Sequence, residues 1–367
     1  MKVFRFFIFP LFAVFVAAAL QKSTELQLVS SFLDGKDVFF KVTPMISVDE
    51  GGNICAIDNR DSVGYIFEAT GNKAIQVGRL GQGPGEFQFP SFICSDSSRV
   101  YIRDQNGLSI FDKKGNFINR IKLLNSTISI ATHQEKIYIA QTGLPDLITL
   151  YDLQGNAISS FGQKYSVDYS LYKGWSTSLT DKVINSGRIF FAKDFVYFVS
   201  TVFGDVFKYD LSGRFISKTN LFNGDLVKNT ENQYFRVGLA NKESPYRYGI
   251  YCDVAFDGDY FYGLMKRKYF QECPGDLIKV EEKTMTIAES YVFAESDVAR
   301  SGKCSLSDLG LNRSSDKRTQ FVISLYDDQT GDNRINIYEP KKISLISPST
   351  PTDPMRKPPT TKSSPTS

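Results

Sequence analysis

The sequence predicts an all-β fold, because its apolar residues occur in short runs that turn-forming residues separate. Aromatic residues, which favour strands, make up 14% of the 367 residues, with 30 Phe and 19 Tyr. A unit of four such runs recurs along the chain at spacings of roughly 40 to 60 residues. This period is typical of propeller blades, so we expect a six-bladed β-propeller of four-stranded antiparallel blades.

The clearest unit contains four apolar runs, at 92–96, 100–104, 108–112 and 115–118. The other units begin near Ile46, Ile128, Ile189, Val254 and Phe321, and the first strand of the last unit is uncertain. A turn of aromatic-Asp-x-x-Gly type recurs at Asp112–Gly115, Asp152–Gly155 and Asp210–Gly213. In such a turn the Asp side chain bonds the backbone, and the Gly adopts the positive φ that closes a hairpin.

A further stretch with strand character, Leu26–Phe32, precedes the first unit. A ring that is not closed would expose strand edges at its ends. We therefore expect Leu26–Phe32 to form the outermost strand of the sixth blade and to close the ring.

The two ends of the chain differ from the repeats. Lys2 and Arg5 precede the apolar run 6–20, which is short for a membrane span and ends in small residues. We predict a signal peptide over 1–19 and a secreted or periplasmic protein without a transmembrane segment after cleavage; an uncleaved anchor is the alternative. The propeller would then span 20–346, and the Ser-, Thr- and Pro-rich segment 347–367 would be a disordered tail.

Cysteine usage fits an oxidising compartment, where disulfides can form. Cys55 and Cys94 lie in apolar strand patterns and are expected to be buried. Cys252, Cys273 and Cys304 lie near predicted loops, where one bridge could form, and the sequence leaves their pairing open.

Composition also limits the function. The single histidine, His133, excludes zinc sites built from several histidines, and it is expected in a turn on the face opposite the long loops. The formal charge is +3, and loss of the two basic residues of the signal peptide leaves a value near +1. This charge gives no reason to expect a nucleic acid partner.

One connector carries a family resemblance. Residues 78–90 read Gly-Arg-Leu-Gly-Gln-Gly-Pro-Gly-Glu-Phe-Gln-Phe-Pro, and Tyr101–Asp104 follow on the next clear strand. This pattern resembles the NHL-repeat signature, and residues 26–338 are similar to the bacterial secreted six-bladed propellers related to NHL and TolB-like domains. The resemblance implies a propeller and an exported location, but not one chemistry, because this fold hosts binders and enzymes alike. Within the connector, we expect Phe87 to fill an apolar position between neighbouring blades.

The candidate ligand-binding surface comes from long loops. Alternation of strand direction places the connectors between blades three and four and between blades four and five on one face, and the tight turns on the other. These connectors are rich in aromatic residues and Arg, the composition of recognition surfaces. The candidate ligand-binding residues are Trp175, Tyr234, Arg236, Tyr246 and Arg247. The alternative is that these rings pack onto blade edges.

The sequence therefore favours an exported binding or scaffold module that recognises a glycan, a peptide or a protein and needs no cofactor. The alternative is a metal-dependent hydrolase or lyase, similar to six-bladed lactonases, at the mouth of the central channel. Asp58 and Asp104 end their strands there and could hold a divalent cation such as calcium, although we expect them rather to cap turns. No catalytic residue is assigned, and the sequence names neither the ligand nor the oligomeric state.

Overall fold

The computed structural model describes residues 23–31, 40–68, 74–123, 126–166, 177–221, 249–266, 276–294, 297, 299, 304–313 and 318–341. Nearly all of the regular structure in this part of the chain is β-strand, and α1 (Thr177–Ile184) is the one helix within it. The predicted all-β fold class is therefore confirmed. No helix in these ranges is long and apolar enough to cross a membrane.

Four sheets each contain four strands that follow one another in the chain and pair antiparallel. The first holds β2 (Met45–Val48), β3 (Ile54–Asp58), β4 (Val63–Phe67) and β5 (Ala74–Val77). The second holds β8 (Phe92–Ser95), β9 (Arg99–Asp104), β10 (Gly107–Asp112) and β11 (Phe117–Ile121). The third holds β12 (Thr127–His133), β13 (Lys136–Gln141), β14 (Ile148–Tyr151) and β15 (Ala157–Phe161). The fourth holds β16 (Gly187–Ala192), β17 (Phe195–Ser200), β18 (Asp205–Asp210) and β19 (Phe215–Asn220).

The last sheet joins the two ends of the chain. Its order is β20-β21-β22-β23-β1-β26-β25-β24. The strands are β1 (Thr24–Ser31), β20 (Tyr251–Phe256), β21 (Tyr260–Met265), β22 (Leu277–Glu281), β23 (Ile287–Phe293), β24 (Cys304–Arg313), β25 (Thr319–Asp327) and β26 (Asp332–Pro340). β1 pairs antiparallel with β26, where Leu26 faces Pro340, and parallel with β23, where Thr24 faces Tyr291. The N-terminal strand thus lies between the last two groups of strands.

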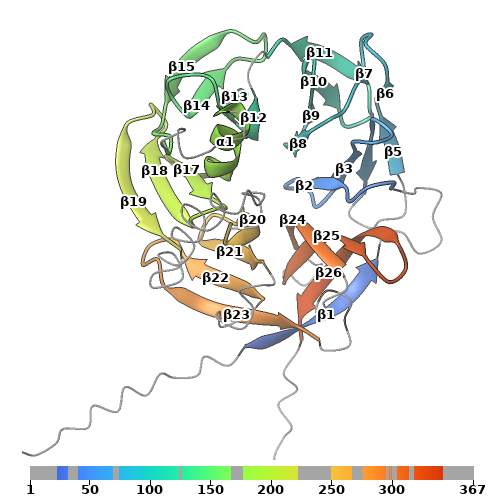
Figure 1. Cartoon of the computed structure of the whole chain (residues 1–367), viewed down its shortest axis with the longest axis vertical. Coiled ribbons are helices and arrows are strands. Elements are labelled where there is room, and N and C mark those ends of the chain that lie inside the picture. The colour runs from blue at the N-terminus through green and yellow to red at the C-terminus, as the bar shows by residue number, and fades with distance from the viewer. Residues whose placement is uncertain are drawn as a thin grey trace, which may run out of the picture.

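The first strands of the groups surround a common centre (Figure 1). Among the described elements, β2, β8, β12, β16, β20 and β24 contact one another in that order, and β24 contacts β2 again. An apolar cluster supports this last contact, because Phe40, Ile54 and Phe67 pack with Val322 and Ile335 from the other end of the chain. Burial of these side chains is a main driving force for joining the two ends.

The predicted tight turns have the expected structure. Asp112 Oδ1 accepts hydrogen bonds from the N–H groups of Lys114 and Asn116, both at 2.8 Å, and Gly115 has φ of +84°. Asp152 and Asp210 bond their own turns in the same way. The roles predicted for Asp and Gly in these hairpins are therefore confirmed.

The connector between the first two sheets folds tightly onto the core. Its two short strands, β6 (Arg79–Leu80) and β7 (Glu86–Phe87), pair in parallel. Phe87 is fully buried and packs edge-to-face on Phe111, with ring centroids 6.3 Å apart. Gly78, at φ of +65°, is needed here because a Cβ would lie 2.2 Å from the Phe87 ring. The expectation that Phe87 is a structural anchor is consistent with this burial.

The structure also differs from the sequence-based expectations. Helix α1 occupies a region that we expected to be a loop, and its Val183 and Ile184 pack on Val202 and Phe203. An eight-residue helix is too short to show a clear apolar period. The N-terminal strand β1 spans Thr24–Ser31, whereas we expected Leu26–Phe32, and Phe32 lies outside the described residues.

Two further expectations concern the ends and the cysteines. The predicted signal peptide 1–19 and tail 347–367 lie outside the described residues, as does Cys273, so the disulfide pairing stays a prediction. Cys55 is buried as expected, whereas Cys94 is only partly buried, because its strand β8 lies beside the central channel.

Candidate functional site

Two connected cavities lie among the first strands of the sheets. The channel-mouth cavity, of about 350 Å³, is lined by residues where these strands begin, such as Met45, Phe92 and Arg188. The deeper cavity, of about 500 Å³, is lined by residues nearer their far ends, such as Glu50 and His133. Ile46, Ile93, Arg188 and Asp253 line both cavities.

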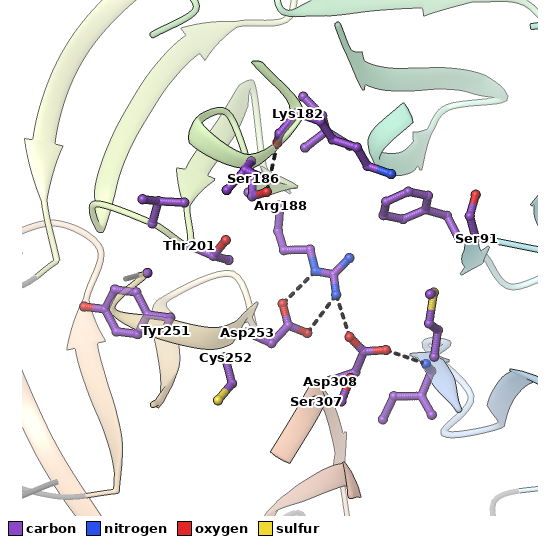
Figure 2. A pocket seen from close by; sticks show the side chains of 18 of the residues that line it. Ser91, Lys182, Ser186, Arg188, Thr201, Tyr251, Cys252, Asp253, Ser307 and Asp308 are labelled. Carbon is purple, nitrogen blue, oxygen red and sulfur yellow. Dashed lines mark hydrogen bonds and ion pairs between the residues drawn. The ribbon is translucent and has the colours of Figure 1, made fainter. Parts of the chain in front are cut away.

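Arg188 and two carboxylates form a network at the boundary between the cavities (Figure 2). Arg188 Nε donates to Asp253 Oδ1 at 2.6 Å, and its Nη2 donates to Asp253 Oδ2 at 3.1 Å. The same Nη2 donates to Asp308 Oδ1 at 2.9 Å. Two parallel bonds to one carboxylate fix the plane of the guanidinium, so the network is geometrically specific.

The same carboxylates also bond the backbones of other first strands. Asp308 Oδ2 accepts the Ile46 N–H at 3.0 Å, and Asp253 Oδ2 accepts the Leu309 N–H at 2.9 Å. The side chains of Asp253 and Asp308 are only 4% and 10% exposed. The network therefore ties β16, β20, β24 and β2 together around the channel.

Burial and the neighbouring opposite charges shift the pKa values of these groups in opposite directions. Burial raises the pKa of Asp308 to about 6, although the Arg188 charge opposes this change. Burial alone would lower the pKa of the Arg188 guanidinium, but the charges of Asp253 and Asp308 raise it above its usual value. Arg188 thus remains charged, and the pKa of Asp308 lies above its usual value.

Two lysines complete the charged lining of the channel-mouth cavity. Lys182 lies in the last turn of α1, and its Nζ stands 5.6 Å from the centroid of the Phe92 ring. Burial lowers the pKa of Lys182, and the nearby cation Arg103 adds to this effect. Burial also lowers the pKa of Lys266, which follows β21. Both amino groups are therefore partly removed from water.

Hydroxyl groups and glycines make up much of the remaining lining. Ser91, Ser186, Thr201 and Ser307 line the channel-mouth cavity. The Ser186 hydroxyl donates to the Lys182 carbonyl at 3.0 Å and so fixes the end of α1. A Cβ at Gly249 would lie 3.0 Å from Lys266 Nζ, so a larger residue there would crowd this amino group.

The residues predicted to bind the ligand lie outside the described residues. Trp175 belongs to 167–176, and Tyr234, Arg236, Tyr246 and Arg247 belong to 222–248. The described residues next to these segments do line the channel-mouth cavity. Lys182 lies six residues after the first segment, Gly249 follows the second directly, and Lys266 directly precedes a third, 267–275.

The aspartates considered for a metal site cap turns instead. Asp58 Oδ1 accepts the N–H groups of Arg60 and Asp61, and its Oδ2 accepts the Lys41 N–H. Asp104 bonds the N–H groups of Asn106, Gly107 and Gln88 in the same manner. Neither aspartate lines the channel-mouth cavity. Within the described ranges, no group of three or more His, Cys, Asp and Glu residues could hold a metal ion.

His133 lies at the far end of the channel. It ends β12, lines the deeper cavity and stacks on Phe191 with ring centroids 4.7 Å apart. Burial lowers the pKa of its imidazole. Its predicted place, at a turn on the face opposite the mouth, is consistent with this position.

Sequence reasoning missed the charged residues of the channel. Each of these residues interrupts the apolar pattern of a first strand: Arg188 is second in β16, Asp253 is third in β20 and Asp308 is fifth in β24. A buried charge in such a position needs a partner of opposite charge, and this interruption is the signal that could have found them.

Comparison with known proteins supports the fold. No family model matches the sequence, and no curated protein matches it. A solved structure of a Bacteroides fragilis protein thought to be exported is 14% identical, with a TM-score of 0.53, over 86% of this chain and 96% of that one. An inactive virginiamycin B lyase from Staphylococcus aureus, solved with quinupristin, is 12% identical, with a TM-score of 0.46, over 88% and 90% of the two chains. BamB from Moraxella catarrhalis is 11% identical, with a TM-score of 0.41, over 80% and 84%. The four-stranded antiparallel sheets, whose first strands follow one another around a common centre, identify the fold as a β-propeller.

Proposed function

We propose that this protein is an exported six-bladed β-propeller, closed by β1, that acts as a binding module with its ligand site over the channel mouth. One observation carries the proposal. The channel-mouth cavity is lined by residues next to the three segments that are rich in aromatic and basic residues. A concave, partly polar site beside such segments suits ligand recognition.

Export is supported by the sequence pattern at the N-terminus. The basic residues Lys2 and Arg5 and the apolar run 6–20 have the order and length of a secretory signal. We propose a secreted or periplasmic location on this basis. The relationship to NHL and TolB-like domains rests on the connector 78–90 and stays a prediction.

The ligand class is a glycan, a peptide or a protein. Trp175 and Arg236 are the residue types that dominate binding energies, because they bury much area and keep a polar group. Asp253 and Asp308 already bond Arg188, so they are not arranged as open ligands for a cation. This arrangement favours a binder over the metal-dependent hydrolase or lyase.

The proposal can be tested with the mature chain, residues 20–367, on a glycan and peptide array. The double substitution Trp175→Ala and Arg236→Ala should weaken binding to the array hits at least tenfold, while the melting temperature stays nearly unchanged. A matched control is Lys114→Met, an exposed lysine on a rim turn. Binding by the double variant equal to wild type would contradict the proposed surface, and loss of binding with a chelator would favour the metal-dependent alternative.

The proposed closure has its own test. Deletion of residues 24–31 would leave the edges of β26 and β23 without their partner, so thermal stability should fall sharply. Deletion of residues 347–367 is the control, and it should leave the melting temperature unchanged. If the β1 deletion melts like the mature chain, the ring does not depend on β1.

A further inference from the structure

Resting on the proposed function, we propose that the channel-mouth cavity binds a peptide segment, with an apolar side chain against one half of its wall and a peptide carbonyl bonded by Arg188 on the other half. The first strands surround the channel in the order β2, β8, β12, β16, β20 and β24. The first three and the last three of these strands therefore lie on opposite sides of it (Figure 1). The two halves differ in chemistry, and this difference carries the inference.

One half of the cavity wall is apolar. Every residue that β2, β8 and β12 contribute to the lining has an apolar side chain, and these residues are Met45, Ile46, Phe92, Ile93 and Ile128. Such a surface is stabilised when it is covered by an apolar group of a ligand. It offers no side-chain partner to a hydroxyl group or a charge.

The other half of the wall carries the charged network. β16, β20 and β24 contribute Arg188, Asp253 and Asp308 to the lining. The Arg188 side chain is 28% exposed, whereas the side chains of the two aspartates are nearly buried. A ligand in the cavity therefore meets the guanidinium before it meets the carboxylates.

Arg188 has a donor left for such a ligand. Its Nε and Nη2 bond the two carboxylates, while its Nη1 has no hydrogen-bond partner in the described part of the chain. In Figure 2 this nitrogen points into the cavity, on the side where Lys182 and Ser91 lie. It can donate to a ligand oxygen without disturbing the bonds to Asp253 and Asp308.

The network favours an acceptor without charge. Asp253 and Asp308 already share one guanidinium, so a ligand carboxylate on Nη1 would be a third negative group beside the same cation. Repulsion between like charges is stronger in a buried site than in water. A neutral carbonyl oxygen accepts the same hydrogen bond without this repulsion.

A peptide joins the two groups that the two halves require. Each of its residues carries a neutral carbonyl next to a side chain, and that side chain can be apolar. A sugar carries hydroxyl groups around its ring, and those that face the apolar half would lose their partners. A cavity of about 350 Å³ is at the small end of ligand pockets and suits a short segment rather than a folded domain.

The test compares three tripeptides that differ only in the central residue. Each has alanine at both outer positions, an acetylated N-terminus and an amidated C-terminus, and the central residue is phenylalanine, serine or aspartate. They are titrated into the mature chain, residues 20–367, by calorimetry at low and high salt. The phenylalanine peptide should bind at least tenfold more tightly than the other two, and salt should change its affinity little, because it has no charge.

Substitutions in each half of the wall test the two contacts separately. Arg188→Lys keeps a positive charge beside both aspartates but removes the Nη1 donor, so binding of the phenylalanine peptide should weaken about tenfold. Phe92→Ala removes apolar surface from the opposite half and should weaken binding by a similar factor. The controls are Arg214→Lys and Phe215→Ala, which change exposed residues of a rim turn and of β19. Both controls should bind the peptide like the wild type.

The outcomes separate this inference from the proposed function. Tighter binding of the aspartate peptide would show that the cavity selects an anion and would overturn the neutral carbonyl. Wild-type affinity in Arg188→Lys or in Phe92→Ala would overturn the contact in that half of the wall. If no tripeptide binds while the array identifies a glycan, the inference fails and the proposed function stands. If the array also yields no ligand, both fail. Should Arg188→Lys prove unstable, Phe92→Ala and the three tripeptides still decide.

Discussion

The carboxylates of the rim turns and those of the channel mouth show two ways of using the same side chain. Asp112, Asp152 and Asp210 bond side chains and backbone N–H groups of their own turns. The side-chain bonds from Asn116, Asn156 and Ser212, and then the backbone N–H bonds, lower the pKa values of these aspartates. Asp253 and Asp308 bond Arg188, which is 65 and 120 residues away, and burial raises the pKa of Asp308. The turn carboxylates shape one hairpin each, whereas the channel carboxylates connect several sheets.

This difference indicates where function can be placed on the ring. A rim turn is complete within about five residues and has no group left for a ligand. The channel mouth is assembled from strands of different sheets, so its charges meet only when the ring is complete. Residues that are brought together in this way can bind a ligand as well as stabilise the fold.

The largest effect should come from the guanidinium that links the channel carboxylates. Arg188→Met leaves Asp253 and Asp308 buried without a positive partner, and the free energy of unfolding should fall by about 3–5 kcal/mol. The control is Arg214→Met, because Asp210 loses this exposed arginine side chain but keeps its bonds from Ser212, and we expect little change. Urea denaturation measures both. An equal loss in the two variants would remove the distinction between channel and turn carboxylates.

The second largest effect should come from the connector 78–90, which lies on the face of the channel mouth. Phe87→Ala removes a fully buried ring that packs on Phe111, so it should cost about 3–5 kcal/mol. Phe89→Ala is the control, since Phe89 is 62% exposed, and it should change the stability little. Stability of Phe87→Ala within error of wild type would mean that this connector is better interpreted as a ligand loop.

The contributions of the two kinds of carboxylate to the stability should change in opposite directions with pH. The folded-state pKa of Asp308 lies near 6, above its unfolded value, so the stability that its proton contributes is present at low pH and is lost as the pH rises from about 4 to about 6. The pKa of Asp112 is lowered, so its contribution is lost instead as the pH falls below about 4. The free energy of unfolding is measured as a function of pH for wild type, Asp308→Asn and Asp112→Asn. The difference between wild type and each variant gives the pH slope that each carboxylate contributes. Slopes of the same sign in both comparisons would contradict the assignment.

The smallest effect concerns a single rim turn. Asp152→Ala removes the bonds to Gln154 and Asn156, and this exposed turn should become slightly less stable, so the melting temperature should fall a little. Asp152→Asn keeps an acceptor oxygen and should lose less. The melting temperature of each variant is the measurement, and neither substitution should alter binding to the hits of the glycan and peptide array. Altered binding would show that the rim turns also take part in ligand recognition.

Much of the fold was predictable because its signals are local. The Asp-x-x-Gly turns, the alternating strands and the burial of Phe87 depend on residues close together in the sequence, so the four-stranded units could be recognised directly. The first strand of the last unit was less clear, because charged and polar residues interrupt its apolar pattern over 304–313. Helix α1 was missed because its eight residues carry too little periodicity.

The sequence by itself therefore determined the fold class, the turn chemistry and the composition of the long connectors. Only the tertiary structure decided which charged residues meet at the channel mouth. Arg188, Asp253 and Asp308 come from the first strands of three different strand groups, β16, β20 and β24, and Lys182 and Lys266 join them from a helix and a strand end. Their pairing depends on the order in which the sheets are arranged around the centre, and no local sequence pattern contains this order. Because these residues are buried there, their charges interact more strongly than they would in water.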